Sequence, residues 1–221
     1  MEPSDPAPGQ PDMEARAIER RIVLSYVPAA TRPALAALLT LDDRLGEIVR
    51  AARDPLIGQM RLTWWHEALV ALDAAPAPAE PILRAIAAGL LPHGVAGAAL
   101  GRIVDGWEAV LAIDSDPAAA LAVHAAERGE MLFALAARLL GGGDARLADA
   151  GAGWALATLC DPRAQASAAA RLAGLTDRRW PRALRPLSAM ALLARDDLDS
   201  AARPGSIGRA ARLFRHWLGG R

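Results

Sequence analysis

The chain has 221 residues, enough to bury one sizeable core. Its basic residues are all arginine, and 25 basic residues balance 25 acidic ones, so the charge argues against nucleic acid as a partner. Hydrophobic residues make up 53% of the chain but aromatics only 4%, and because much of the apolar content is alanine, the composition favours helices over strands.

Short segments rich in proline and glycine divide the chain into helical stretches. Apolar residues recur at helical spacings within these stretches, and none alternates apolar and polar residues over the length of a strand. No repeat of a solenoid type recurs. We therefore expect an all-α fold, a single helical bundle, with helices in chain order at residues 13–28, 33–53, 55–73, 80–91, 95–113, 117–140, 145–159, 162–173, 181–195 and 206–218.

The start of the chain and its single cysteine indicate its compartment. Residues 1–12 are rich in proline and are expected to form a disordered leader, followed by one helical domain over 13–221. Cys160 excludes an internal disulfide and fits a reducing, cytoplasmic compartment, where we expect it to be a small buried residue. The longest apolar run, 85–100, is too short and too interrupted to span a membrane, so only peripheral contact with the inner membrane stays open.

Several helix starts carry a specific signal. An aspartate followed by a proline supplies an N-cap side chain and a residue suited to the first helical position. Asp12 and Ser206 are further expected N-caps. The aspartate–proline pairs are Asp54-Pro55, Asp116-Pro117 and Asp161-Pro162.

The stretch 117–140 has the clearest apolar stripe. Arg128 and Arg138 are placed off this stripe. The stripe comprises Leu121, Leu132, Leu135, Leu139 and Leu140.

Two acids in the second predicted helix are candidates for chemistry. Asp43 and Glu47 are four residues apart and share a helical face, where two carboxylates repel by a few tenths of a kcal/mol unless a cation lies beside them. A Mg²⁺ ion held by carboxylates and by substrate phosphates is one such cation. The alternative is a solvated face on which Glu47 pairs with Arg44 or Arg50.

The helix over 55–73 contains two adjacent tryptophans. Trp64 and Trp65 point about 100° apart, so both are buried only if the helix is covered on two sides, and we expect a central helix. Arg61 either presents its fork of donors to a phosphate or pairs with an acid on a facing helix. His66 is expected in a surface or supporting role.

Other catalytic signals are weak. The four histidines have no metal-ligand spacing, and there is no P-loop, nucleophile elbow or dinucleotide fingerprint. The basic cluster over 178–182, Arg-Arg-Trp-Pro-Arg, would contact anionic lipid or a partner, or form a solvated loop.

The run from Pro55 to Leu69, PLIGQMRLTWWHEAL, resembles the squalene/phytoene synthase family. It is most similar to a shorter bacterial branch that is related to a mitochondrial complex I assembly factor. The resemblance covers about residues 15–221, and it is specific at the double tryptophan and looser elsewhere. Further segments similar to the family are Asp105–Glu108, Gly129–Gly141, Gly153–Leu156 and Pro204–Ser206.

The resemblance implies an all-α fold of the trans-isoprenyl diphosphate synthase type around a central cavity. Active members join two prenyl diphosphates head to head, with Mg²⁺ held by two aspartate-rich helix motifs. The implied partner is therefore a prenyl diphosphate or other isoprenoid lipid, and the cofactor, if the protein is active, is Mg²⁺. The implied diphosphate and metal candidates are Asp42, Asp43, Glu47 and Arg61, with Asp43 and Glu47 as metal ligands.

The chain departs from the family pattern at both motifs. The first motif falls either on Asp42, Asp43 and Glu47 or on Gly46, Glu47 and Arg50. After Gly153–Leu156 the second motif supplies one acid, Asp161, which also reads as an N-cap, so the inventory does not provide a three-metal clamp. Three hypotheses follow: an isoprenoid enzyme, a non-catalytic descendant that binds a lipid or a protein as in respiratory complex assembly, and a helical interaction protein with a collapsed cavity.

Overall fold

The structure, a computed structural model, describes residues 10–199 and 203–220, and within these ranges it is helical without any strand, as expected. Short 3₁₀ turns and one π-helical segment, η3, connect or extend the α-helices. The main elements are α1 (Gln10–Ser25), α2 (Arg32–Ala51), α3 (Pro55–Ala71), α4 (Pro81–Gly89), α5 (Gly97–Glu108), η2 (Ala109–Ala112), α6 (Pro117–Val123), η3 (His124–Glu130), α7 (Met131–Leu139), α8 (Leu147–Thr158), α9 (Gln165–Leu172), α10 (Arg185–Leu198) and α11 (Ile207–Gly219).

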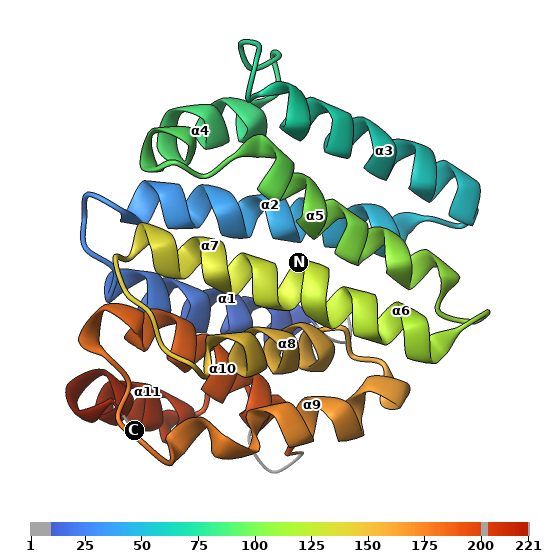
Figure 1. The fold of residues 1–221 in the computed structure, drawn as a ribbon. Coiled ribbons are helices and arrows are strands. Elements are labelled where there is room, and N and C mark those ends of the chain that lie inside the picture. Colours follow the sequence, from blue (N-terminus) through green and yellow to red (C-terminus); the bar gives the residue numbers. More distant parts are fainter. Residues whose placement is uncertain (1–9, 200–202, 221) are drawn as a thin grey trace, which may run out of the picture.

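The helices are stacked across the molecule in an order that differs from their order in the chain (Figure 1). α3 and α4 lie at one end, α9 and α11 lie at the other, and α2, α5, α7 and α8 lie between them. α1 packs against both α2 and α10, so it bridges the two halves of the stack. Within the described ranges, no helix combines the length and the apolar character that crossing a membrane requires.

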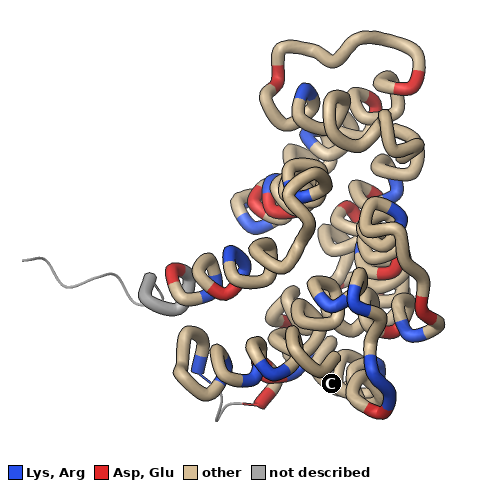
Figure 2. Tube along the Cα trace, turned by 90° about the vertical axis from the view of Figure 1, so that its left-hand side faces the viewer, with Lys and Arg blue, Asp and Glu red and all other residues tan. Residues whose placement is uncertain are grey.

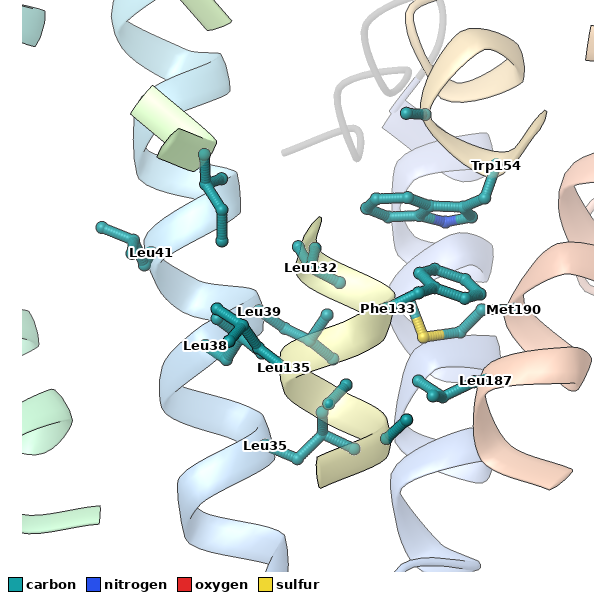
Figure 3. Packing of buried hydrophobic residues seen from close by; sticks show 14 of the residues in the cluster. Leu35, Leu38, Leu39, Leu41, Leu132, Phe133, Leu135, Trp154, Leu187 and Met190 are labelled. Carbon is teal, nitrogen blue, oxygen red and sulfur yellow. The ribbon is translucent and has the colours of Figure 1, made fainter. Parts of the chain in front are cut away.

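The core between α2, α7 and α10 is built mainly from leucine, with a few aromatic side chains at its edge. Figure 3 shows Leu132 and Leu135 of α7 directed toward α2, and Phe133 on the opposite side of α7. Phe133 packs against Trp154 of α8, with 5.6 Å between ring centroids. Trp154 and Met190 line a cavity as well as the core, so this packing forms one wall of the site described below.

Most of the expected caps are confirmed. The carboxylates of Asp54, Asp116 and Asp161 each accept a hydrogen bond from a backbone N–H at the start of a helix, at 2.8–3.1 Å. Ser206 caps α11 in the same way. The expectation for Asp12 was wrong, because α1 begins at Gln10. Pro11 fits the first turn of a helix, so the helix extends upstream of Asp12.

The predicted leader overlaps the first helix. Residues 10–12 of the expected leader belong to α1. Residues 1–9 lie outside the described residues.

α6, η3 and α7 form a continuous helical rod, as the stretch 117–140 predicts, but the position assigned to Arg128 was wrong. Arg128 lies on the buried side of the rod and is only 3% exposed. It precedes Leu132 by four residues and Leu135 by seven, spacings that share one helical face. A long arginine is tolerated there because every part of its guanidinium finds a partner, as described below.

The expectation that α3 is a central helix was also wrong. Trp65 is buried, but Trp64 is 47% exposed and Met60 67% exposed. α3 contacts its neighbours mainly through α5, and its buried residues Leu62, Trp65 and Leu69 lie on one face. Adjacent tryptophans therefore mark a helix at the edge of the stack, with one ring in the core and one on the surface.

η3 and α8 approach each other closely at Gly129 and Gly151. A Cβ atom on Gly129 would lie 2.4 Å from the carbonyl oxygen of Gly151, and a Cβ on Gly151 would lie 2.3 Å from that of Gly129. The contact is between backbones, which cannot yield as a flexible side chain does. Glycine at both positions thus allows η3 and α8 to pack together and brings their polar side chains into the interior.

We predict that Gly151→Ala lowers the free energy of unfolding by about 1–3 kcal/mol, because the added methyl group overpacks this contact. Gly208→Ala is the matched control, since Gly208 is also helical and a Cβ there meets no residue of the described ranges within 4 Å. The control should be neutral or stabilising by up to about 1 kcal/mol through helix propensity. Urea unfolding followed by circular dichroism measures both, and equal stabilities of the two variants would contradict the prediction.

Candidate functional site

A cavity of about 810 Å³ opens among α1, α2, α8, α10 and the turn that follows α5. Its apolar wall includes Val23, Val49, Trp107, Trp154, Met190 and Leu193. Charged side chains also line it, and they come in equal numbers, five acids and five arginines. These are Glu19, Asp42, Asp43, Asp161, Asp197, Arg16, Arg20, Arg50, Arg128 and Arg209.

The deepest charged pair is Asp42 with Arg128. Nε and Nη2 of Arg128 donate to the two carboxylate oxygens of Asp42 at 2.8 and 2.9 Å. The indole N–H of Trp107 donates to Oδ1 of Asp42 at 2.8 Å. Both charged side chains are almost completely buried. This is the planar, two-pronged geometry in which an arginine–carboxylate pair is strongest.

Two aromatic rings pack against the Arg128 guanidinium. Its central carbon lies 4.2 Å from the ring centroid of Trp107 and 4.4 Å from that of Trp154. Its remaining nitrogen, Nη1, donates to the carbonyl of Ala155 at 3.1 Å and to the hydroxyl of Thr158 at 3.0 Å. The cation is thereby satisfied by hydrogen bonds and by two cation–π contacts.

His124 completes this polar cluster from one helical turn away. Nη1 of Arg128 also donates to Nε2 of His124 at 3.1 Å, and Nδ1 of His124 lies 2.7 Å from the carbonyl oxygen of Gly106. Nε2 is therefore the acceptor and Nδ1 carries the proton, which defines the neutral tautomer. Burial, reinforced by the positive charge of Arg128, lowers the pKa of His124 from 6.5 to about 3.

The pKa values of the two adjacent aspartates of α2, Asp42 and Asp43, are shifted in opposite directions. Burial alone would raise the pKa of Asp42, but the charge and hydrogen bonds of Arg128 and Trp107 outweigh it, so this pKa lies below its usual value. Asp43 sits at the cavity rim in an ion pair with Arg20 of α1. There the loss of hydration outweighs the charge of Arg20, and the pKa of Asp43 is raised.

A second buried pair lines the cavity where α1, α10 and α11 meet. Nε and Nη2 of Arg209 in α11 donate to the carboxylate of Glu19 in α1 at 2.8 and 2.9 Å. Nη1 of Arg209 donates to Asp197 of α10 at 2.6 Å, and Asp197 also pairs with Arg16. One guanidinium thus joins α1, α10 and α11, the three helices of this side.

The structure brings together some of the predicted site residues and separates others. Asp42, Asp43 and Asp161 line the cavity, and Asp161 also pairs with Arg163. Glu47 is exposed, is not part of the cavity lining, and pairs with Arg44 at 3.2 Å, one of the two partners expected for a solvated face. Arg61 is exposed on α3, also away from the cavity lining.

These carboxylates do not fit a magnesium cluster in the arrangement they adopt. Asp42 has both oxygens bound by Arg128, Asp43 is bound by Arg20, and Asp161 is bound by Arg163 and by its own helix cap. In the part of the chain that the structure describes, no three of the side chains His, Cys, Asp or Glu are grouped as metal ligands. A metal would have to displace guanidinium groups, at the cost of leaving those cations unpaired.

Arg50 differs from the other charged residues of the lining. Every carboxylate of the lining has an arginine partner, and four of the five lining arginines are used in these pairs. Within the described ranges Arg50 has no hydrogen-bond or ion-pair partner. Its Nη1 lies beside Gly46, where a Cβ atom would be only 2.8 Å away and would also meet the ring of Trp107. Gly46 therefore leaves the space in which the Arg50 guanidinium lies next to Trp107.

Cys160 was expected to be buried, but it is exposed. It lies on the cavity wall between the end of α8 and the Asp161 cap, with a positive backbone φ of 58°. A non-glycine residue in this conformation marks a tight turn. The turn, rather than burial, accounts for the position of the thiol.

No protein-family model, no curated protein and no solved structure matches this chain. The resemblance to the squalene/phytoene synthase family therefore rests on the sequence motif alone. The geometry of the cavity carries the functional argument.

Sequence reasoning missed the central residues of the site. Arg128, His124 and Trp107 received no role, and Glu19 and Arg209 were not considered. The spacing of Arg128 from Leu132 and Leu135 was the available signal, because it places a charge within an apolar face. A charge at such a position requires a buried partner of opposite sign.

We predict that the neutral state of His124 makes the protein less stable in mild acid. The unfolded chain takes up a proton on this histidine as the pH falls below about 6.5, whereas the folded protein resists protonation until about pH 3. Stability should therefore fall between pH 6 and pH 4. His124→Gln should reduce this slope by up to about 1.4 kcal/mol per pH unit.

The control for this slope is His93→Gln, since His93 is exposed. Urea unfolding at several pH values measures the slope for each protein. If His124→Gln and the wild-type protein lose stability at the same rate per pH unit, His124 is not the group responsible.

Proposed function

We propose that this chain binds an anionic isoprenoid lipid, a prenyl diphosphate or a close relative, with the hydrocarbon in the central cavity and the anionic head beside Arg50. The proposal takes up the non-catalytic alternative derived from the sequence. The observation that carries it is a largely apolar cavity whose acids are all neutralised internally while one arginine is left without a carboxylate in the described part of the chain.

The size and lining of the cavity support an apolar ligand. A volume of about 810 Å³ falls within the range of small-molecule pockets, about 300–1,000 Å³. Trp107, Trp154, Met190 and Leu193 offer an apolar surface that extends from the buried core. A hydrocarbon chain placed there gains the free energy of leaving water without displacing any of the described ion pairs.

Arg50 supports recognition of an anionic head group. A guanidinium presents a planar fork of donors that matches phosphate oxygens. The other lining arginines already bind carboxylates, so a head group meets Arg50 without breaking a pair. Recognition by an arginine requires no metal, in contrast to the clamp that the family resemblance implies.

The same pairs argue against head-to-head prenyl transfer. That reaction, as the resemblance implies, relies on free carboxylates to hold Mg²⁺ against the diphosphates. Here Asp42 and Asp43 are bound by Arg128 and Arg20. We therefore favour binding over condensation, and turnover is an outcome that the experiment below can detect.

We predict that farnesyl or geranylgeranyl diphosphate binds the protein in the presence of EDTA, raises its melting temperature and changes its tryptophan fluorescence, since Trp107 and Trp154 line the cavity. Leu193→Trp should weaken binding by about tenfold or more by filling part of the cavity. Val123→Trp is the control, because Val123 is a partly exposed apolar residue on α6, outside the cavity lining.

Two results would contradict the proposal. Equal binding by the wild-type protein and Leu193→Trp would place the ligand elsewhere. Magnesium-dependent release of inorganic diphosphate, with formation of a coupled hydrocarbon and loss of both in Asp43→Asn, would establish an enzyme instead.

A separate prediction concerns the head group. Arg50→Gln should weaken binding of farnesyl diphosphate by about tenfold, because a charge-assisted contact with the phosphate is lost. It should leave binding of uncharged farnesol unchanged. Arg53→Gln is the matched control, since Arg53 is exposed nearby but does not line the cavity. Equal losses for both ligands in isothermal titration calorimetry would contradict a role for Arg50 in recognising the anion.

A further inference from the structure

The C-terminal helix, α11, packs with its polar side inward. Amphipathic helices at a protein surface usually bury their apolar face. α11 instead buries Arg209 and His216 together with Leu213. Arg209 is held by Glu19 and Asp197, as described above, and Nε2 of His216 lies 2.6 Å from the hydroxyl of Ser188. These polar contacts determine which side of α11 faces the interior.

The apolar side of α11 is left exposed as a result. Ile207, Phe214 and Leu218 are 88%, 56% and 58% exposed, and they follow one another at intervals of seven and four residues. Such intervals place them on one helical face, with Ala211 between them. A Cβ atom at Gly208 would meet no described residue within 4 Å, so this side of the helix start is not covered by the described part of the chain.

Exposed arginines lie near this apolar face. α11 contains no carboxylate. Of its three arginines, Arg209 is buried, Arg212 pairs with Asp196 at 3.0 Å, and the exposed Arg215 has no ion-pair partner within the described ranges. The basic segment 178–182 adjoins the end of α11, because the N–H of Trp180 donates to the carbonyl of Gly220 at 2.8 Å. Figure 2 shows arginines gathered around the C-terminus.

The basic segment presents its cations to solvent. Trp180 is buried and donates its indole N–H to Leu175, which anchors the segment to the protein. Arg178, Arg179 and Arg182 are exposed, and their side chains form no ion pair in the described part of the chain. The adjoining residue Asp177 is a single carboxylate beside three arginines. The segment therefore keeps a net positive charge.

α3 presents the other large exposed apolar face, with Leu56, Ile57, Met60 and Trp64. It lies at the opposite end of the molecule from α11 (Figure 1). Its charges are mixed, because Glu67 and Asp54 accompany Arg61 and Arg53. α3 therefore lacks the cationic border that distinguishes α11.

We propose that α11 and the basic segment 178–182 form a docking surface for an anionic lipid membrane. α11 lies along the membrane surface with Ile207, Phe214 and Leu218 among the acyl chains, and the arginines contact lipid phosphates. A helix with one apolar face, a polar face rich in arginine and low overall hydrophobicity is the type that binds in this way. The net positive charge of this surface favours an anionic lipid membrane as its partner over a second copy of the chain, whose net charge is zero. This inference stands whether or not the cavity binds an isoprenoid.

The experiment is flotation of the full chain with vesicles of phosphatidylcholine alone or mixed with phosphatidylglycerol. The protein should float with the anionic vesicles, much less with the neutral ones, and less again as salt is raised. The double variant Phe214→Ser with Leu218→Ser should reduce binding by about tenfold or more. The matched control, Ile57→Ser with Met60→Ser on α3, should bind like the wild-type protein.

A charge series tests the arginines separately. Replacement of Arg178, Arg179 and Arg182 by glutamine should reduce binding to anionic vesicles by about tenfold or more. The same replacement of Arg53, Arg61 and Arg84, which are exposed elsewhere, changes the net charge equally and should have little effect.

Three results would overturn the proposal. They are equal losses from the α11 and α3 variants, equal losses from the two charge series, and binding that is the same for neutral and anionic vesicles. Light scattering gives a further check: a wild-type dimer that the Phe214→Ser and Leu218→Ser variant converts to a monomer would assign the face to a second copy of the chain. Unchanged melting temperatures show that the variants remain folded.

Discussion

The ion pair between Asp42 and Arg128 is the interaction on which the interior of this protein depends. It joins α2 to η3 and draws in Trp107 from α5 and Trp154 from α8, so four parts of the stack meet around one guanidinium. A buried charge is costly unless its partner and hydrogen bonds are complete. Here they are complete, and burial, reinforced by the same cation, keeps His124 neutral.

This pair also determines the chemistry available to the cavity. Asp42, one of the diphosphate or metal candidates that the family resemblance implies, is instead a counter-ion of Arg128 within the protein. Glu19 is likewise neutralised by a buried arginine, Arg209. Between the two pairs lies an apolar space with Arg50 at its edge. With its acids neutralised internally, the cavity offers an apolar space and one arginine to the anionic lipid that we propose as its ligand.

α11 connects this interior to the outer surface. Arg209 faces the cavity and is held by acids of α1 and α10. Because that contact turns the polar side of the helix inward, Phe214 and Leu218 are turned outward. The electrostatics of the cavity wall and the exposed apolar face thus have one cause. A lipid-binding cavity and a lipid-docking helix on one protein would suit exchange of a ligand with a membrane, although each rests on its own observations.

The sequence by itself determined the helices, because alanine-rich composition, helical spacing and aspartate–proline caps are local properties of the chain. Asp54, Asp116 and Asp161 cap helices as expected for this reason. It also named Asp42 and Asp43 as candidates, and both line the cavity. Only the tertiary structure decided their partners, Arg128 and Arg20, which are distant in the chain. It likewise decided that α3 lies at the edge and that Cys160 is exposed. Burial and ion pairing depend on which helix faces compete for the interior, and that competition is settled by packing between helices rather than by any single helix.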